Sequence, residues 1–188
     1  MRQVLFIQGG GDGTHDEWDN RLVDSLEAAL GPDYEICYPR MPNEADPDYL
    51  NWKKAIAREM ASLEDGAILV GHSVGATILV NAIAEDQPLR PLGGLMLLAA
   101  PFLGEGGWAS EEFEPQEYLG AKLPDGVPVY LYHGSSDEEV PVAHVDLYAR
   151  AIPQAVIRRL DNRDHQLGND LSEVGKDIKS LASAPDGA

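Results

Sequence analysis

The chain has 188 residues, of which 44% are hydrophobic and 24% are charged, a balance typical of a folded globular protein and not of collagen, a coiled coil or a disordered chain. The single cysteine, Cys37, excludes an internal disulfide, and no Cys and His spacing matches a zinc site, so hydrophobic burial must stabilise the fold. The formal net charge of −18 at pH 7 opposes contact with a phosphate backbone, so we expect no nucleic-acid partner.

Apolar runs are short throughout the sequence. The first one, residues 4–7, is too short for the core of a signal peptide, and no segment reaches the roughly 18 apolar residues that a membrane span needs. We therefore expect no membrane partner and a cytoplasmic location.

Six short segments rich in Val, Ile, Leu and Tyr are predicted as strands: residues 4–8, 34–38, 67–71, 93–99, 127–133 and 155–160. The runs AILVG and GLMLLAA lack polar alternation, which is typical of strands covered on both faces of a parallel sheet. Segments with helical periodicity separate the strands: residues 18–30, 49–63, 74–84, 141–151 and 171–181.

This alternation predicts an α/β fold: a doubly wound sheet of about six parallel strands in the order 2-1-3-4-5-6, with helices on both faces. Such sheets bind ligands at the carboxyl ends of their strands. Two irregular stretches, residues 39–48 and 101–126, each follow a predicted strand and should lie on that functional rim. We expect one domain over residues 1–181 and a flexible tail over residues 182–188.

The strand at residues 67–71 runs into Gly71-His72-Ser73-Val74-Gly75, which precedes an apolar helix. This is the G-x-S-x-G pattern in the strand, turn and helix context in which a serine hydroxyl projects above the sheet. A serine that opens a helix is often only an N-cap. The preceding strand favours Ser73 as a nucleophile.

A serine nucleophile needs a histidine base and an acid that orients the base. Asp137 follows the strand at residues 127–133, and His165 follows the strand at residues 155–160, so both come at carboxyl ends in the chain order Ser, Asp, His. Alone, Asp137 suits an Asx turn and His165 suits a solvated loop. Together with Ser73 they indicate a triad, with Glu138 and Glu139 as alternative acids. His72 and His133 are interpreted as packing or hydrogen-bonding residues.

The glycine-rich loop of residues 8–13 follows the first predicted strand. Its missing side chains let backbone N–H groups approach a ligand, so we expect the amides of Gly10 and Val74 to form the oxyanion hole. A dinucleotide site is the alternative, but G-x-G-x-x-G is not matched cleanly.

With these motifs in place, the chain resembles the small α/β-hydrolase family typified by the retinoblastoma-binding serine hydrolase and its bacterial relatives. The resemblance rests on the glycine loop before Trp18 and on three further motifs, which are Gly71-His72-Ser73-Val74-Gly75-Ala76, Gly134-Ser135-Ser136-Asp137 with Val140-Pro141, and Asp164-His165. It implies a minimal sheet without a large cap, a Ser73, Asp137 and His165 triad, and hydrolysis of small carboxylic esters or amides without a cofactor.

The sequence departs from that family at two places. Gln8 precedes the glycines where many relatives have Pro or His, and Asp164 precedes the last histidine where Gly is frequent. The motif Leu-x-Cys-x-Glu is absent around Cys37, so no retinoblastoma-type partner is inferred.

Aromatic and acidic residues alternate in residues 102–118, beside the predicted nucleophile. We expect Phe102, Leu103 and Trp108 to border the acyl pocket, although the aromatic side chains would equally anchor a solvated loop. If acids ring the pocket, neutral or cationic substrates should be preferred; those acids are Glu105, Glu111, Glu112, Glu114 and Glu117. A catalytically silent binding module and an acyltransferase are the alternative functions.

Overall fold

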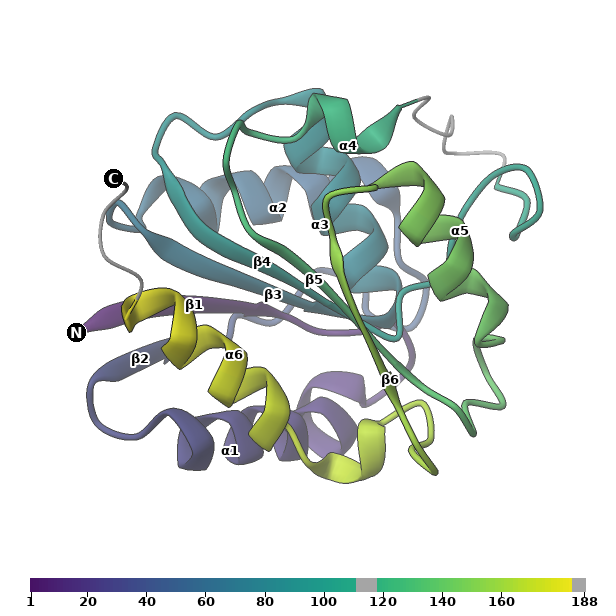
Figure 1. Ribbon diagram of the computed structural model, residues 1–188, viewed down its shortest axis with the longest axis horizontal. Helices are drawn as coiled ribbons and strands as arrows, with labels where there is room; N and C mark the ends of the chain where they lie inside the picture. Colours follow the sequence, from purple (N-terminus) through teal and green to yellow (C-terminus); the bar gives the residue numbers. More distant parts are fainter. Residues whose placement is uncertain (111–117, 184–188) are drawn as a thin grey trace.

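The computed structural model describes residues 1–110 and 118–183, and within them six parallel strands form one sheet in the order β2-β1-β3-β4-β5-β6 (Figure 1). The predicted fold class and strand order are therefore confirmed. The strands are β1 (Arg2–Ile7), β2 (Tyr34–Cys37), β3 (Ala67–His72), β4 (Leu92–Leu98), β5 (Val129–Gly134) and β6 (Val156–Leu160).

The helices connect the strands much as predicted. They are α1 (Asp19–Leu30), α2 (Tyr49–Ala61), α3 (Ser73–Glu85), α4 (Leu119–Lys122), α5 (Ala143–Ala151) and α6 (Ser172–Ser183). Short helix α4, a π-helical turn at Thr14–Trp18 and a 3₁₀ turn at Leu167–Asn169 were not predicted, because a turn or two of helix is too short to show a periodic pattern.

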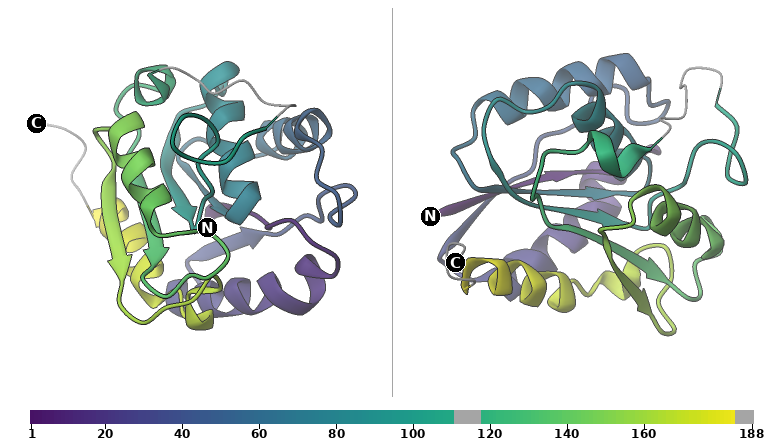
Figure 2. Two further views of the ribbon diagram at one scale, coloured as in Figure 1. Left: turned by 90° about the vertical axis from the view of Figure 1, so that its right-hand side faces the viewer. Right: turned by 45° about the horizontal axis from the view of Figure 1, so that its top comes forward.

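Each face of the sheet is covered by its own helices (Figures 1 and 2). Helices α2, α3 and α5 pack on one face around Trp52, Ile56 and Leu79. Helices α1 and α6 pack on the other face around Leu22 and Ile178. Strand β3 lies in the middle and is buried along its whole length, which explains its continuous apolar sequence.

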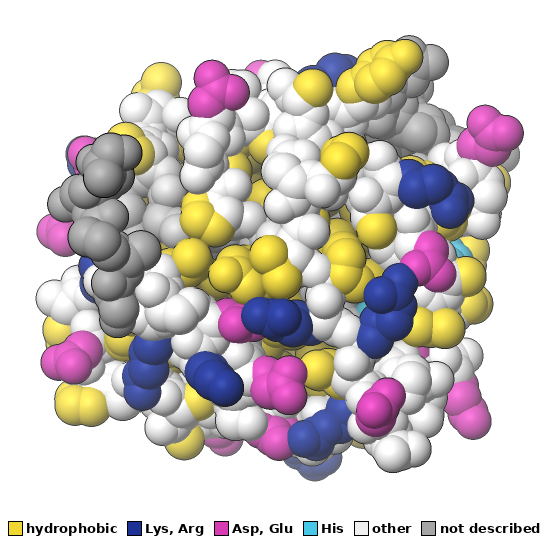
Figure 3. All heavy atoms as spheres, viewed as in Figure 1, with side chains coloured by type: hydrophobic (Ala, Val, Ile, Leu, Met, Phe, Trp, Pro, Cys, Tyr) yellow, Lys and Arg dark blue, Asp and Glu magenta, His cyan; other side chains and the backbone are white. Residues whose placement is uncertain are grey.

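Charged side chains accompany the edge strand β6. Arg158 pairs with Asp177 of α6 at 3.0 Å, and Arg159 pairs with Asp146 of α5. In Figure 3, the Lys and Arg side chains on this face lie among Asp and Glu side chains and do not form one basic patch. Charges along an edge strand oppose pairing with another chain.

The loops that follow β1, β3, β5 and β6 meet at the carboxyl end of the sheet, on the side away from the N-terminus (Figure 1). No large cap covers this end in the described part of the chain. Helix α6 extends two residues beyond the predicted domain end at residue 181. The rest of the expected tail, residues 184–188, lies outside the described residues. So do residues 111–117, which include four of the acids expected around the pocket. No helix in the described ranges is long and apolar enough to cross a membrane.

Candidate active site

Ser73 stands at a sharp turn between β3 and α3. Its φ is 52°, a left-handed value that side chains rarely adopt and that marks stored backbone strain. The flanking glycines make the turn possible. A Cβ at Gly75 would lie 1.9 Å from the backbone oxygen of Gln8, and one at Gly71 would lie 2.6 Å from the Cα of Ala76. The G-x-S-x-G pattern thus has a steric basis in this chain.

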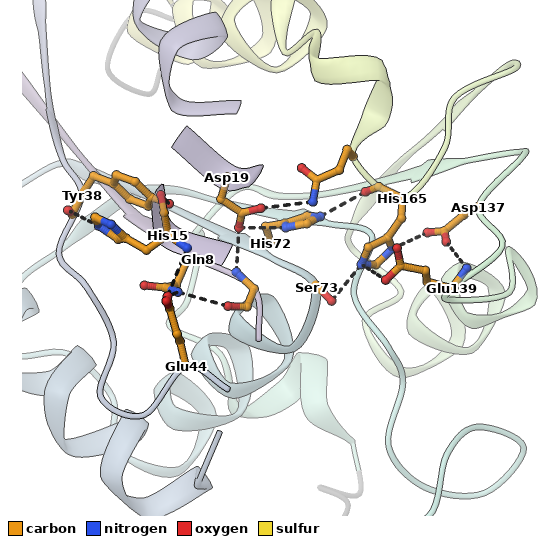
Figure 4. A network of polar contacts seen from close by, with 12 residues as sticks. Gln8, His15, Asp19, Tyr38, Glu44, His72, Ser73, Asp137, Glu139 and His165 are labelled. Carbon is orange, nitrogen blue, oxygen red and sulfur yellow. Dashed lines mark hydrogen bonds and ion pairs between the residues drawn. The ribbon is translucent and has the colours of Figure 1, made fainter. Parts of the chain in front are cut away.

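The three residues predicted as a triad form a continuous chain of hydrogen bonds (Figure 4). The distance from His165 Nε2 to Ser73 Oγ is 3.0 Å, and the distance from His165 Nδ1 to Asp137 Oδ2 is 2.8 Å. Three residues separated by up to 92 positions in the sequence are therefore brought together at the carboxyl ends of β3, β5 and β6. In this arrangement Nδ1 donates to the carboxylate, and Nε2 is left to accept the serine proton.

Asp137 is held by its own turn. Its Oδ1 accepts the backbone N–H groups of Glu139 at 2.9 Å and Val140 at 2.8 Å. Burial raises the pKa of Asp137, but the hydrogen bonds from His165 and Val140 outweigh it and keep the pKa below its usual value. The carboxylate therefore stays ionised at neutral pH. Of the alternative acids, Glu139 is largely exposed. Its Oε2 lies 3.8 Å from His165 Nε2, the ring nitrogen that faces Ser73, whereas an orienting acid would contact Nδ1.

The two backbone amides predicted as oxyanion donors belong to the glycine loop and to the residue after Ser73. The N–H of Gly9 donates to Asp19 at 2.7 Å, and the N–H of Gly11 donates to the carbonyl of Glu44 at 2.6 Å. Within the described residues, the N–H of Gly10 between them has no acceptor. Val74 lies in the first turn of α3, where helical N–H groups have no intrahelical acceptor. Both amides are thus available to a ligand.

The remaining histidines serve other contacts. Ring Nε2 of His133 donates to the carbonyl of Val140 at 2.8 Å and lies 3.4 Å from Asp137 Oδ2, and burial lowers the pKa of His133. Ring Nδ1 of His144 accepts the N–H of Phe102 at 2.8 Å, and burial lowers its pKa too. His15 stacks on Tyr38 with ring centroids 4.2 Å apart. The hydrogen bond of His133 fits the structural role predicted for it. Among these histidines and His165, only His165 has a ring nitrogen within hydrogen-bond distance of Ser73 Oγ.

Sequence reasoning missed the polar residues behind the site. Asp19 was assigned only to a helix, yet its carboxylate is fully buried and bonds to Gly9, His72 and Gln166. A buried carboxylate at the first position of a helix shows no sequence pattern that distinguishes it from an exposed one. The ordinary preference for acids in the first helical turn was the available signal, and it indicates only local stabilisation.

Gln8, which departs from the family pattern, joins two loops. Its side-chain Oε1 accepts the N–H of Met41 at 3.0 Å, and its Nε2 donates to Glu44 Oε2 at 2.6 Å. The same Glu44 Oε2 accepts the N–H of His15 at 3.1 Å. The loop of residues 39–48 therefore packs against the glycine loop, on the functional rim where it was predicted.

A cavity of about 610 Å³ opens at Ser73, and its size suits a small molecule. Its walls come from the glycine loop, the first helical turn and the loops of the triad, and the lining includes Gly10, Trp18, Ser73, Ser136, His165 and Gln166. The predicted pocket residues are not part of this lining. Phe102 packs edge-on against Tyr148 at 5.0 Å, Trp108 packs edge-on against His144 at 5.2 Å, and Leu103 pairs with Trp108. These contacts fit the alternative interpretation, in which the aromatic side chains anchor their own loop.

The cavity is acidic. Four carboxylates contribute to its lining, and no Lys or Arg does so among the described residues; the acids are Asp12, Glu138, Glu139 and Asp164. Of the acids that the sequence indicated, Glu105 is not in this lining, and the other four lie outside the described residues. In residues 1–110 and 118–183, no three His, Cys, Asp or Glu side chains are grouped so that they could hold a metal ion.

Comparison with known proteins gives the family of the chain. The profile of the alpha/beta hydrolase family matches residues 4–175, so the chain belongs to that family. A search of curated protein sequences found no match.

Solved structures share the fold at low sequence identity. The ydeN gene product from B. subtilis has a TM-score of 0.77 at 20% identity, over 98% of this chain and 100% of that chain. The esterase RhEst1 from Rhodococcus sp. ECU1013 has a TM-score of 0.74 at 18% identity, over 96% and 91% of the two chains. Arabidopsis thaliana SOBER1 L63A has a TM-score of 0.68 at 16% identity, over 96% and 99%. At these identities the likeness concerns the fold.

Proposed function

We propose that this protein is a serine hydrolase that cleaves small carboxylic esters, and by the same chemistry amides, through an acyl-enzyme intermediate. The observation that carries the proposal is the 3.0 Å contact between His165 Nε2 and Ser73 Oγ, with Asp137 on the opposite ring nitrogen. Among the similar structures, RhEst1 is described as an esterase, which supports the same class of reaction.

The residues present account for each proton in the reaction. As Ser73 Oγ bonds to the acyl carbon, its proton passes to His165 Nε2, and the Asp137 carboxylate stabilises the imidazolium that forms. The negative oxygen of the tetrahedral intermediate faces the N–H groups of Gly10 and Val74; in comparable sites such donors each contribute about 3 to 4 kcal/mol. His165 then gives the proton to the leaving oxygen as the carbon–oxygen bond breaks.

Water completes the cycle. His165 takes a proton from a water molecule as that water attacks the acyl carbon, and it returns the proton to Ser73 Oγ as the acid is released. The site therefore returns to its starting state without a redox partner. The cavity of about 610 Å³ would hold the acyl and leaving groups next to Ser73.

Burst kinetics with p-nitrophenyl acetate test the proposal. The wild-type protein should release one equivalent of p-nitrophenol rapidly and should be labelled at Ser73 by a fluorophosphonate, because both reactions need an activated serine. Ser73→Ala should lose the burst and the label. Ser62→Ala, which changes an exposed serine after α2, is the matched control and should retain both.

Three results would contradict the proposal in different ways. An undiminished burst in Ser73→Ala places the nucleophile elsewhere. A wild-type protein that neither reacts with the ester nor takes the label is a silent binding scaffold. Transfer of the acyl group to an added amine or alcohol in preference to water identifies an acyltransferase that uses the same residues.

A further inference from the structure

A second aspartate and histidine pair lies beside the proposed triad (Figure 4). His72 is the last residue of β3 and the neighbour of Ser73, and Asp19 is the first residue of α1. His72 Nδ1 lies 2.9 Å from Asp19 Oδ2, and His72 Nε2 lies 3.0 Å from the backbone oxygen of His165. Both side chains are buried, with 0% of Asp19 and 1% of His72 exposed.

The partners of His72 determine its protonation. The carbonyl oxygen of His165 can only accept, so Nε2 carries a proton. The Asp19 carboxylate also accepts the N–H of Gly9 at 2.7 Å and the side-chain N–H of Gln166 at 3.2 Å. Hydrogen bonds donated to a carboxylate favour its ionised form, as does the N-terminus of α1. The proton between Asp19 and His72 therefore belongs to Nδ1, and His72 is an imidazolium.

The pKa directions agree with this assignment. Burial lowers the pKa of His72, but the facing Asp19 carboxylate outweighs it and raises the pKa above its ordinary value. Burial raises the pKa of Asp19, but His72 and the N–H of Gly9 outweigh it and lower the pKa. The titratable groups that face His72 are Asp19 from α1, His165 after β6, and Asp137 from the turn after β5.

This buried pair connects the three segments that form the active site. Through Gly9 it holds the glycine loop, in which Gly10 is the next residue. Through His72 it holds the turn that carries Ser73. Through the carbonyl of His165 and the side chain of Gln166 it holds the segment that carries the base. His165 is thereby fixed at two points, its ring by Asp137 and its backbone by His72.

We propose that the Asp19 and His72 ion pair positions the His165 backbone and the glycine loop around Ser73, so that both residues act in the reaction through their neighbours. This proposal rests on the hydrolase function proposed above. Neither side chain needs to touch substrate, because the hydrogen bonds set where the base and the oxyanion donors stand. A displacement of about 1 Å in such a group costs about 100-fold in rate.

Kinetics of two variants, Asp19→Asn and His72→Gln, test the positioning role. We expect kcat for p-nitrophenyl acetate, per folded molecule, to fall about 10- to 100-fold with KM nearly unchanged, because the misplaced base acts on the transition state more than on substrate binding. Asp177→Asn is the matched control. It neutralises a partly buried aspartate of α6 that bonds to Tyr132 and Arg158, away from the cavity, and it should retain wild-type kcat.

Histidine ¹⁵N NMR of the wild-type protein supplies a readout that does not depend on activity. At pH 7.5, above the ordinary histidine pKa of about 6.5, both ring nitrogens of His72 should still carry protons. This measurement also keeps the proposal testable if a variant fails to fold. A neutral His72 at pH 7.5 would overturn the ion pair.

Two kinetic outcomes separate this proposal from the proposed function. Variants that melt at lower temperature but keep wild-type kcat per folded molecule would show that the pair serves stability alone, which overturns the positioning role. If instead Ser73→Ala hydrolyses the ester as well as the wild type does, the hydrolase function itself fails, and the positioning proposal fails with it, whatever the charge on His72.

Discussion

The protein places two aspartate and histidine pairs within one hydrogen-bonded neighbourhood, and they differ in what the second ring nitrogen contacts. In the pair of Asp137 and His165, that nitrogen faces the Ser73 hydroxyl and an open cavity. In the pair of Asp19 and His72, it is bonded to a backbone carbonyl and closed off from solvent. The same two residue types thus have opposite capacities for proton transfer.

The difference supports both proposals: the histidine that faces an exchangeable hydroxyl is proposed as the base, and the histidine with two fixed acceptors is proposed as a structural cation. A hydroxyl can give its proton to a histidine and accept it back, whereas a backbone carbonyl has no proton to give and only accepts a hydrogen bond. The buried pair should therefore control stability and geometry, and the pair facing the cavity should control chemistry. Changes at each pair can break or sharpen this comparison.

The largest expected effect is on the rate of ester hydrolysis, and it comes from the pair of Asp137 and His165 that faces the cavity. Asp137→Asn keeps the shape of the side chain but favours the wrong tautomer of His165, so kcat for a short-chain aryl ester should fall about 10⁴-fold. Steady-state kinetics will measure it, with circular dichroism to verify folding. A fall of less than tenfold in a folded variant would remove Asp137 as the orienting acid.

The next largest effect is on the stability of the buried pair. His72→Ala leaves the Asp19 charge buried without its cation, which should lower the free energy of unfolding by about 3 to 5 kcal/mol. Arg158→Ala breaks a partly exposed ion pair with Asp177 and should cost about 1 kcal/mol or less. Urea unfolding at pH 7 compares the two. Equal costs would mean that burial does not distinguish these ion pairs.

The pH dependence of stability should carry the sign of the buried cation. Because the pKa of His72 is raised in the folded state, its contribution is complete below the ordinary pKa of about 6.5 and is lost as pH rises through the folded value. His133 and His144 have lowered pKa values and contribute in the opposite direction, gaining stability as pH rises.

Comparing the wild type with His72→Gln separates the pH-dependent contribution of His72 to stability from those of His133 and His144. The difference in unfolding free energy should shrink between pH 6 and pH 10, by about 1.4 kcal/mol for each unit by which the folded pKa exceeds the unfolded one. Urea titrations across this range will show it. A difference that stays constant with pH would mean that His72 does not lose a proton on unfolding there.

The smallest expected effect is a preference for substrate charge in the cavity at Ser73. Four carboxylates line the cavity, so at low salt a cationic aryl ester should have a kcat/KM up to about tenfold above that of an anionic ester of similar size. Salt at 0.5 M should remove most of this preference by screening. Neutralising Glu138 and Glu139 with Gln should reduce it too. If the anionic ester is cleaved equally well at low salt, the acids do not govern entry.

Much of the fold, and the meeting of Ser73, Asp137 and His165, could be predicted because both follow from local patterns. Continuous apolar runs indicate buried parallel strands, and the positions just after β3, β5 and β6 must meet at one edge of a sheet with this strand order. Ser73, Asp137 and His165 occupy those positions, so topology alone brings them together.

The rest of the site depends on contacts that no local pattern encodes. Asp19 and His72 are 53 positions apart, and the start of a helix carries no information about which strand end it faces. The pocket was predicted at Phe102, Leu103 and Trp108 because aromatic residues follow β4. Instead, Phe102 packs against Tyr148 and Trp108 packs against His144. Side-chain direction in a long loop is set by packing, which the sequence does not show.

The bond between Gln8 and Glu44 has a consequence for how this scaffold can be redesigned. Because Gln8 also accepts the N–H of Met41, hydrogen bonds join the loop of residues 8–13 to the loop of residues 39–48. We therefore expect that neither loop can be exchanged separately for the loop of a relative. A chimera with a foreign glycine loop would leave the Glu44 carboxylate without its amide donor. Grafting is therefore expected to succeed only when residues 8–13 and 39–48 are transplanted together.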